Sequence, residues 1–471
     1  MTLQNSAQYD AVIIGAGIGG LVCGCYLAKA GMKVLIAEQH YKPGGYCTSF
    51  TRKGITFDAA AHSFGGYRKD GIVRKIFEDL EIDKKIKIKR FDPIDIIKTP
   101  DYKVIFWADL DKTIDGLQKS FPDERDNIRK FLFFLSRPDP NSLIRTRSCT
   151  FKHLLDEYFK NDKLKAILSF PLFGNGGLPP SQMSAFIGSK IFTETLLDGG
   201  YYSGSGMQAL PDAFVEKFKE FGGEIRLSCL AKKIRVEDNK VKGVVVEKND
   251  FISSKCVVSS CDARQTFLTL IGRNKISYDM VSKINNMTPS LSMFVLYLGM
   301  DEYFKKLFKH GINLWFLSDY DLDKVYNSAK RGNFNSLSRY LIHISHDRKS
   351  VLAYMNTPYK NNKYWNVNKR HISEAFIEKI EKEAIPGISD HIVYQDSATP
   401  PTLNRYTLNY KGAAYGWAPI PKQLADLDFK KPSFIRGLYL AGHWSTLGLG
   451  IPGVSYIAYN IANLIMKKYK S

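Results

Sequence analysis

Three glycines and one acidic residue near the start of the chain have the spacing of a dinucleotide site. Gly15, Gly17 and Gly20 form a GxGxxG pattern, and Glu38 follows Gly20 by 18 positions. In such a site the first glycine permits a tight turn, the second lets backbone approach a pyrophosphate, and the third lets a helix pack closely on a strand. The N–H groups at a helix N-terminus favour phosphate. Glu38 would accept hydrogen bonds from adenosine ribose hydroxyls and repel a 2′-phosphate, which disfavours NADP.

The elements around these residues are those that the site requires. An apolar run over 11–14 predicts a strand, a helix follows and ends near Gly31, and a second apolar run over 34–37 completes a βαβ unit. Another GxGxxG match, GLGIPG at 448–453, has only 18 residues after it and cannot begin a second such unit. The first unit therefore predicts these binding residues: Gly15, Ala16, Gly17, Ile18, Gly19, Gly20, Glu38 and Gln39.

The βαβ unit does not say which adenine dinucleotide binds, and four later segments bear on that choice. They are PGGYCTSFTRKGITFDAAAHSFGG at 43–66, residues 201–227, residues 231–263, and GLYLAGHWSTLGLGIPGVSYIAYNIANLI at 437–465. These segments resemble those of flavoproteins in the phytoene desaturase, carotenoid isomerase and retinol saturase group. The resemblance spans the whole chain and is strongest in these segments. It implies that the cofactor is FAD.

The resemblance also assigns further cofactor contacts. It places Gly44, Gly45 and Tyr46 near the phosphates and ribityl chain, the backbone around Ala231 against the adenine, and Gly442 and His443 near the ribityl and pyrophosphate region. A helix beginning near 452–454 would direct its positive end at the flavin pyrimidine ring, where negative charge develops on reduction. The contacts assigned there are Ile451, Pro452, Gly453 and Val454.

Two positions depart from the pattern of many relatives. Tyr46 stands where they carry an arginine, and His443 stands where they carry an acidic residue. Tyrosine supplies no cation, and histidine donates a hydrogen bond without a fixed negative charge. Flavin affinity or redox potential is therefore expected to differ. A structural, hydrogen-bonded histidine is the alternative for His443.

Reactions of this group move a hydride between a carbon and the flavin, or isomerise a double bond with reduced flavin, so the cofactor carries most of the chemistry. The chain shows no nucleophile triad, metal cluster or paired carboxylates, and we expect no metal. His62, which follows FDAAA in the segment assigned near the flavin, is the candidate proton donor or acceptor. The alternative is a histidine packed beside the cofactor.

The chain is long enough for two lobes. We predict an α/β fold in which a Rossmann-like FAD-binding domain, a central parallel sheet with flanking helices, is formed by residues 1–70, 196–270 and 425–471. It is intertwined with a mixed-sheet and helical substrate domain formed by 71–195 and 271–424, with strands near 94–107 and 290–299 and helices elsewhere. Apolar residues at helical spacing over 154–168 predict a core-facing helix.

Charge and composition bear on partners and location. Lys and Arg exceed Asp and Glu by 67 − 47 = +20, which favours a polyanion, and without a nucleic-acid module we expect an anionic membrane surface and no nucleic acid. Residues 166–189 and 437–466 lack charged residues, but glycines and prolines interrupt both, so neither predicts a span. Seven scattered cysteines argue against a disulfide framework, and the N-terminus lacks a secretory pattern. We expect a cytoplasmic protein, peripheral on the membrane face.

These features favour an FAD-dependent oxidoreductase that desaturates, saturates or isomerises carbon–carbon bonds of a long apolar small molecule, such as a carotenoid, a retinoid or a lipid acyl chain. One alternative is a flavoenzyme similar to the amine oxidases, although the closing segment resembles the carotenoid group more closely. Another is a noncatalytic lipid or prenyl carrier on the same fold, which the intact glycines and Glu38 argue against. The oligomeric state is left open.

Overall fold

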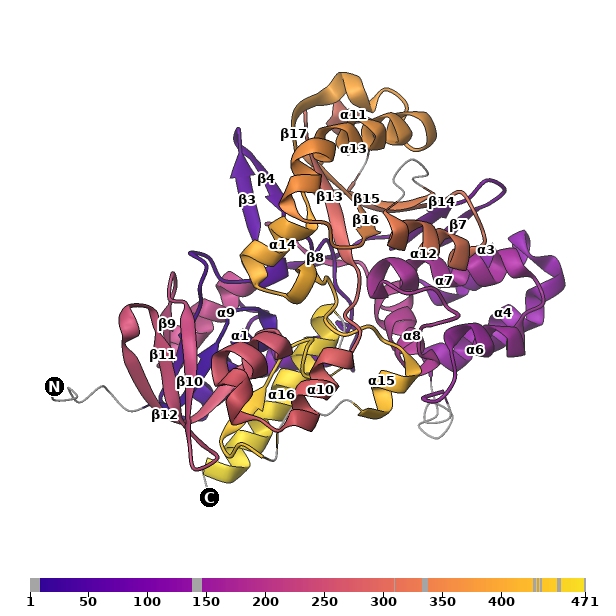
Figure 1. Ribbon diagram of the computed structural model, residues 1–471. Coiled ribbons are helices and arrows are strands. Elements are labelled where there is room, and N and C mark those ends of the chain that lie inside the picture. Colours follow the sequence, from indigo (N-terminus) through magenta and orange to yellow (C-terminus); the bar gives the residue numbers. More distant parts are fainter. Residues whose placement is uncertain are drawn as a thin grey trace.

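Strands from three distant parts of the chain form the first of two large sheets in the computed structural model (Figure 1). The structure describes residues 9–137, 146–308, 310–332, 338–426, 429, 432, 434–446 and 450–469. The strand order is β10-β11-β12-β1-β2-β9, and β18 pairs with β12. The strands are β1 (Tyr9–Ile14), β2 (Val34–Ala37), β9 (Glu224–Arg226), β10 (Ala231–Glu237), β11 (Lys240–Val246), β12 (Phe251–Ser259) and β18 (Leu438–Leu440).

The βαβ unit predicted at the front of the chain forms the centre of this sheet. β1 is parallel to both β2 and β12, and α1 (Ile18–Lys29) connects β1 to β2. The helix is apolar almost all round, and it is buried between the sheet, α9 (Ala209–Glu220) and α16 (Gly450–Tyr469). The predicted end of the helix at Gly31 lies two residues beyond the observed end.

The second sheet is a mixed sheet of order β17-β13-β16-β15-β14-β6-β7. All of its neighbouring strands are antiparallel except β14 and β6. The strands are β6 (Asp95–Lys98), β7 (Lys103–Phe106), β13 (Ser292–Met300), β14 (Ile312–Leu317), β15 (Arg339–Ile344), β16 (Ser350–Thr357) and β17 (Ile392–Ala398). The predicted strands near 94–107 and 290–299 belong to this sheet.

The expectation of helices elsewhere in residues 71–195 and 271–424 was wrong at five places, where β5 (Ile88–Arg90), β14, β15, β16 and β17 occur. Every residue of β15 and β16 is buried. A strand buried on both faces does not alternate between polar and apolar residues, so its sequence lacks the period of two that identifies a strand.

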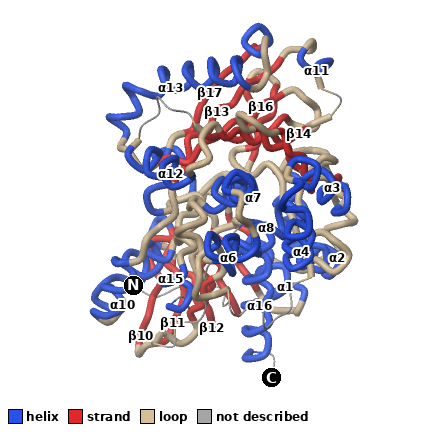
Figure 2. The backbone as a smooth tube through the Cα atoms, turned by 90° about the vertical axis from the view of Figure 1, so that its right-hand side faces the viewer, coloured by secondary structure: helices blue, strands red, loops and turns tan. Residues whose placement is uncertain are grey.

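Helices cover both faces of the second sheet (Figure 2). α13 (Asn362–Glu383) packs on one face through Phe376 and Ile380, against Phe294 and Leu296 of β13. α7 (Asp162–Gly176) packs on the other face, where Phe170 contacts Trp315 of β14. This second face is turned toward the cavity described below.

The remaining elements connect and cover the sheets. The helices are α2 (Ile72–Asp79), α3 (Leu110–Ser120), α4 (Arg125–Ser136), α6 (Phe151–Tyr158), α8 (Ala185–Phe192), α10 (Tyr278–Asn286), α11 (Phe304–Leu307), α12 (Leu322–Arg331), α14 (Pro400–Thr407) and α15 (Pro421–Asp426). β3 (Ser49–Arg52) pairs with β4 (Ile55–Asp58), and β5 (Ile88–Arg90) pairs with β8 (Tyr201–Ser203).

The described residues of the two uncharged stretches are mostly buried, although Tyr456 and Leu464 of the second are exposed. α7 contains Pro171 and ends at Gly177, which adopts a left-handed conformation, so residues 166–189 form two helices. α16 has 20 residues, and Lys467 and Lys468 lie in its last turn, where cations are favourable. Among the described residues, no helix is both long and apolar enough to cross a membrane.

Candidate functional site

A cavity of about 1870 Å³ lies between the carboxyl ends of the first sheet's parallel strands and the second sheet. It collects residues from the βαβ unit and from three of the four later segments singled out in the sequence, 43–66, 231–263 and 437–465, whereas residues 201–227 contribute none. The predicted residues on its wall are Gly15, Gly17, Ile18, Gly19, Glu38, Gln39, Gly44, Gly45, Tyr46, His62, Ala231, Gly442, His443, Ile451, Pro452, Gly453 and Val454. Two predicted contacts, Ala16 and Gly20, are absent from the wall.

The glycine loops contact one another at the start of α1. Gly44 donates its N–H to the Ala16 carbonyl at 2.8 Å, and Gly17 and Gly44 form a bridge between the two loops. A Cβ on Gly19 would lie 3.2 Å from the Gly442 Cα. The loop after β1, the turn at 44–45 and the segment after β18 therefore form one continuous backbone surface.

Gly20 serves the fold behind this surface. A Cβ on Gly20 would lie 2.1 Å from the Gly15 carbonyl oxygen, whereas a Cβ on Gly17 would meet no atom within 4 Å. The helix therefore approaches the loop closely only because position 20 has no side chain. Gly17 faces open cavity, as a glycine does where backbone approaches a phosphate.

Glu38 holds the loop from the end of β2. Its Oε2 accepts the Ala16 N–H at 2.6 Å, and its Oε1 accepts the His40 N–H at 2.8 Å. Burial raises the pKa of the carboxyl, while the two backbone donors oppose that rise. The carboxylate lines the cavity and has lone pairs left for ribose hydroxyls.

The wall beyond Glu38 contains a residue that the sequence reasoning missed. Gln265, at the start of a π-helical segment after β12, lines the cavity together with Ala231. Its Oε1 is buried and has no hydrogen-bond partner among the described residues. Such an acceptor suits a donor such as an adenine amino group. Its sequence position, a few residues beyond a buried strand, carried no signal of this role.

Tyr46 and His443 lie side by side on the wall, with ring centroids 6.3 Å apart and an interplanar angle of 19°. The Tyr46 hydroxyl donates to the Ala413 carbonyl at 2.9 Å and accepts from the Asn409 amide at 3.2 Å. Tyr46 thus fixes the segment that follows α14. Burial lowers the pKa of His443 to about 4, so the ring is neutral at pH 7, and its Nε2 is buried without a partner among the described residues.

The first turn of α16 forms another part of the wall. Gly450 through Val454 all face the cavity, so the positive end of a 20-residue helix dipole is directed there. The predicted start near 452–454 lies within this turn. Gly448, the first residue of the second glycine match, lies outside the described residues.

His62 lies where the cavity meets the second sheet. Its ring centroid is 5.6 Å from that of His343 and 5.8 Å from that of Tyr354. Burial lowers the pKa of His62 to about 4. The side chain is therefore a neutral imidazole at pH 7, able to accept a proton from a neighbouring group.

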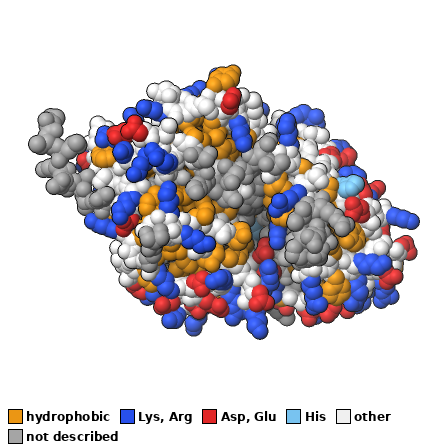
Figure 3. Space-filling model, turned by 90° about the horizontal axis from the view of Figure 1, so that it is seen from below, with side chains coloured by type: hydrophobic (Ala, Val, Ile, Leu, Met, Phe, Trp, Pro, Cys, Tyr) orange, Lys and Arg blue, Asp and Glu red, His pale blue; other side chains and the backbone are white. Residues whose placement is uncertain are grey.

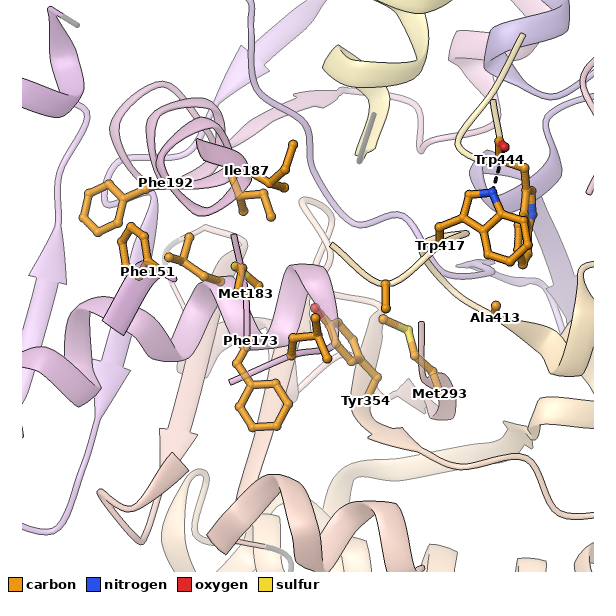
Figure 4. Close-up of a cluster of buried hydrophobic side chains, with 14 of the residues drawn as sticks. Phe151, Phe173, Met183, Ile187, Phe192, Met293, Tyr354, Ala413, Trp417 and Trp444 are labelled. Carbon is orange, nitrogen blue, oxygen red and sulfur yellow. Dashed lines mark hydrogen bonds between the residues drawn. The ribbon is translucent and has the colours of Figure 1, made fainter. Parts of the chain in front are cut away.

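The wall farthest from the glycine loops comes from elements that the sequence did not single out as a site. Asn175 of α7 and Ile187 and Ile191 of α8 face Met293 and Tyr354 of the second sheet across the cavity. Figure 4 shows Met293 and Tyr354 next to each other in the surrounding core, with Ile187 on the facing side. Residues 166–189 are mostly buried, so they form core and cavity wall and are not exposed as a membrane-facing segment.

The residues present fit FAD by three observations of the cavity. Facing glycines leave the phosphate region open, Glu38 retains acceptors for a ribose, and the orphaned atoms of Gln265 and His443 offer hydrogen bonds at two further points. The volume also exceeds the roughly 300–1,000 Å³ typical of a single small-molecule pocket. The cavity can therefore hold a dinucleotide and a second molecule.

The fold and site define an α/β protein with a Rossmann-like sheet and a second mixed sheet, as in the flavin-dependent amine oxidases. Residues 13–80 match the family described as NAD(P)-binding Rossmann-like domain. A Methanosarcina mazei oxidoreductase structure matches with a TM-score of 0.67 and 15% identity, covering 97% of this chain and 100% of that one. Putrescine oxidase bound to putrescine matches with a TM-score of 0.65 and 12% identity, covering 98% and 99%. At these identities the likeness concerns the fold.

Sequence similarity identifies the group within that fold. The all-trans-retinol 13,14-reductase of Danio rerio is 24% identical over 92% of this chain and 82% of its own length. Prolycopene isomerase 2 of an Oncidium hybrid cultivar is 26% identical over 96% and 83%. The lycopene-forming phytoene desaturase of Pantoea ananas is 24% identical over 97% and 98%. The predicted resemblance is confirmed: over nearly its whole length the chain is similar, at about 25% identity, to retinol reductase, prolycopene isomerase and phytoene desaturase sequences.

Proposed function

We propose that this chain binds FAD and acts on carbon–carbon bonds of a long, unsaturated apolar molecule of carotenoid, retinoid or lipid acyl type, by desaturation, saturation or isomerisation. The observation that carries the proposal is the single cavity that joins the glycine loops to the apolar wall of α8 and the second sheet. We place the cofactor domain at 1–70, 196–270 and 425–471 and the substrate domain at 71–195 and 271–424. Relatives named for retinol, prolycopene and phytoene support this substrate class.

The proposed roles of the cofactor residues follow from their positions. The loops at Gly17 and Gly44 would bind the pyrophosphate, Glu38 the adenosine ribose, and the backbone at Ala231 the adenine, while α16 would present its N-terminus to the flavin ring. FAD, when bound, supplies the hydride acceptor or donor of the reaction. The protein's contribution is to hold an apolar chain against it and to exclude water.

His62 is the proposed proton acceptor or donor of this site. It lies between the cofactor segments and Tyr354, inside the cavity that would hold the substrate. As a neutral ring it could accept a proton from substrate carbon next to the site of hydride removal. The loss of activity in His62→Phe without loss of bound flavin would support this role, and unchanged turnover would exclude it.

The central experiment is to identify the lipids that copurify with the protein and to add each one anaerobically to the flavin-loaded enzyme. Bleaching or reoxidation of the flavin by a polyene supports the proposal. Reaction with putrescine or another amine would favour the amine oxidase alternative. Lipid binding by a protein that takes up no FAD would favour the noncatalytic carrier and overturn the proposal.

We also propose that the protein lies on a membrane surface, from which an apolar substrate enters. Tyr456 and Leu464 of α16 are 54% and 44% exposed, and both line the cavity, as does Lys422 of α15. The end of the molecule that carries these helices has hydrophobic side chains gathered among Lys and Arg (Figure 3). Anionic surfaces attract such a combination. The protein should sediment with anionic vesicles at low salt and not with neutral ones, and a failure to bind anionic vesicles excludes this partner.

A further inference from the structure

The cavity-facing side of the second sheet contains a buried cation without a carboxylate partner. Arg339 of β15 is 5% exposed. Its Nη1 donates to the Asn356 Oδ1 at 2.9 Å, and its guanidinium carbon lies 3.5 Å from the ring centroid of Phe173. No Asp or Glu among the described residues forms an ion pair or hydrogen bond with it, and residues 333–337, which precede it in the chain, contain neither.

Two donors of this pair are left unused. Arg339 Nη2 and Asn356 Nδ2 are buried and have no hydrogen-bond partner among the described residues that meets ordinary geometry. Burial lowers the pKa of Arg339 to about 9, so the guanidinium is still charged at pH 7. A buried charge or donor without a partner destabilises a fold, and its usual explanation is a partner that the chain itself does not supply.

The Arg339 and Asn356 pair lies directly behind the cavity wall. Asn356 and the cavity-lining Met293 are register partners on adjacent strands. Tyr354 and Tyr415 also line the cavity, and the charge of Arg339 acts on both phenol groups. The Tyr415 hydroxyl donates to the Gly174 carbonyl. Asn356 also lies close enough to the Tyr415 hydroxyl to influence its ionisation. The positive charge of Arg339 thus lies behind two tyrosines that line the cavity.

A neighbouring carboxyl does not neutralise this charge. Asp95 of β6 acts electrostatically on Tyr354, and it accepts the indole N–H of Trp315 at 2.8 Å. Burial raises the pKa of Asp95 to about 7, so it is about half protonated at neutral pH. Among the described residues, no hydrogen bond or ion pair joins Asp95 to Arg339.

From this arrangement we infer that the substrate has an acidic end: a long apolar chain that terminates in a carboxylate, bound against Tyr354 and Tyr415 with Arg339 behind them. The inference rests on the proposed function, because it assigns the cavity beside these tyrosines to the substrate. An acidic end group would supply the missing negative charge and accept a hydrogen bond from the Tyr354 hydroxyl. The glycine loops that would bind the cofactor's phosphates lie on the first sheet, so those phosphates do not fill this role.

The test compares ligands that share one polyene. The flavin-loaded protein is titrated with all-trans-retinoic acid and all-trans-retinol, and binding is followed by quenching of tryptophan fluorescence. The acid should bind at least about 10-fold more tightly than the alcohol, as expected for a hydrogen bond to a charged group. The same titration is carried out with oleic acid, which has a carboxylate but no polyene. Tight binding of both acids shows that the carboxylate is recognised on any chain, whereas binding of retinoic acid alone restricts the site to acidic polyenes.

Two substitutions test the residues that carry the charge. Arg339→Met removes the cation and keeps an unbranched apolar side chain, and it should weaken acid binding about 10- to 100-fold with less than about 3-fold effect on the alcohol. Asn356→Asp places a carboxylate at the Nη1 contact of Arg339. It should weaken acid binding similarly while the unfolding temperature stays equal or rises. If the Arg339→Met protein does not fold, acid binding by the Asn356→Asp protein tests the inference by itself.

Equal affinity of wild-type protein for acid and alcohol, or unchanged acid binding in Asn356→Asp, overturns the inference. Flavin content is measured separately in each protein from its visible absorbance. A wild-type protein that binds no flavin refutes the proposed function. A flavin-loaded protein that does not distinguish acid from alcohol refutes only the acidic end of the substrate.

Discussion

Two alanine substitutions in the glycine loop should separate the cofactor site from the fold. At Gly20 the new Cβ would lie 2.1 Å from the Gly15 carbonyl oxygen and 3.3 Å from the Ser260 Cβ. The first distance is about 1 Å shorter than a normal contact, and the obstructing atom is backbone, so α1 or the loop must move. We expect Gly20→Ala to destabilise the folded protein by about 3 kcal/mol, the upper end of the cost of overpacking.

At Gly17 the same change should leave the fold intact. The residue has φ −69° and ψ 170°, which any residue adopts, and a Cβ there would meet no protein atom within 4 Å. Stability should change by less than about 0.5 kcal/mol. The methyl group would, however, occupy the space where phosphate approaches the loop. Losing hydrogen bonds to a charged group lowers affinity by about 10- to 100-fold, and we expect a loss of this size for FAD.

The assay uses the flavin-free forms of both variants. Urea unfolding reports the stability of the fold, and titration with FAD reports affinity. Gly20→Ala should unfold at lower urea concentration, while Gly17→Ala should unfold with wild-type protein and bind FAD weakly. If Gly17→Ala is destabilised as much as Gly20→Ala, or binds FAD as wild-type protein does, the distinction between a ligand-facing and a packing glycine is wrong.

Three further outcomes are expected. Burial lowers the pKa values of His62, His343 and His443, those of His62 and His443 from 6.5 to about 4. As the pH falls, these histidines become protonated in the unfolded chain before they do in the folded protein. The folded protein should therefore lose stability between about pH 6.5 and about pH 4. The loss is at most about 3 kcal/mol for each of His62 and His443, and unfolding followed at several pH values would reveal it. Glu38→Gln should weaken FAD binding about 10-fold, as measured by titration. The side-chain NH₂ group of glutamine would face either the Ala16 N–H or the His40 N–H, and a donor cannot accept that hydrogen bond. Truncation before Gly442 should abolish flavin retention on desalting, and a truncated protein that stays yellow would contradict the role of α16.

The glycine-lined part of the candidate site could be predicted from the sequence, because glycine loops impose their own local backbone geometry. Gly15 has φ +97° and Gly44 has φ +127°, conformations in which other residues are strained, so glycine at these positions marks tight turns. Ala16 was predicted as a contact but lies behind the wall, where its N–H and carbonyl join Glu38 and Gly44. Backbone contacts of this kind leave no side-chain signal.

The substrate part could not be predicted in the same way. Tyr354 and Tyr415 belong to segments separated by 61 positions, and only the pairing of β13 with β16 and the packing of residues after α14 bring them to one wall. The strands involved are buried on both faces, so neither periodicity nor composition distinguishes them from buried helices. The buried Arg339 and His343 are the two polar residues in a mostly apolar strand, and they were the local irregularities that could have indicated a special position.

The pairing of β18 with β12 has a consequence for how the protein is made. Strand β18 and helix α16 join the same sheet and cavity as β1, although more than 400 positions separate them. During synthesis the ribosome releases the glycine loop long before the residues that close the pocket. Tight cofactor capture is therefore expected only after translation has passed α16. Until then, the apolar faces of α1 and β12 that α16 and β18 cover remain open in the nascent chain, where they are natural binding sites for chaperones.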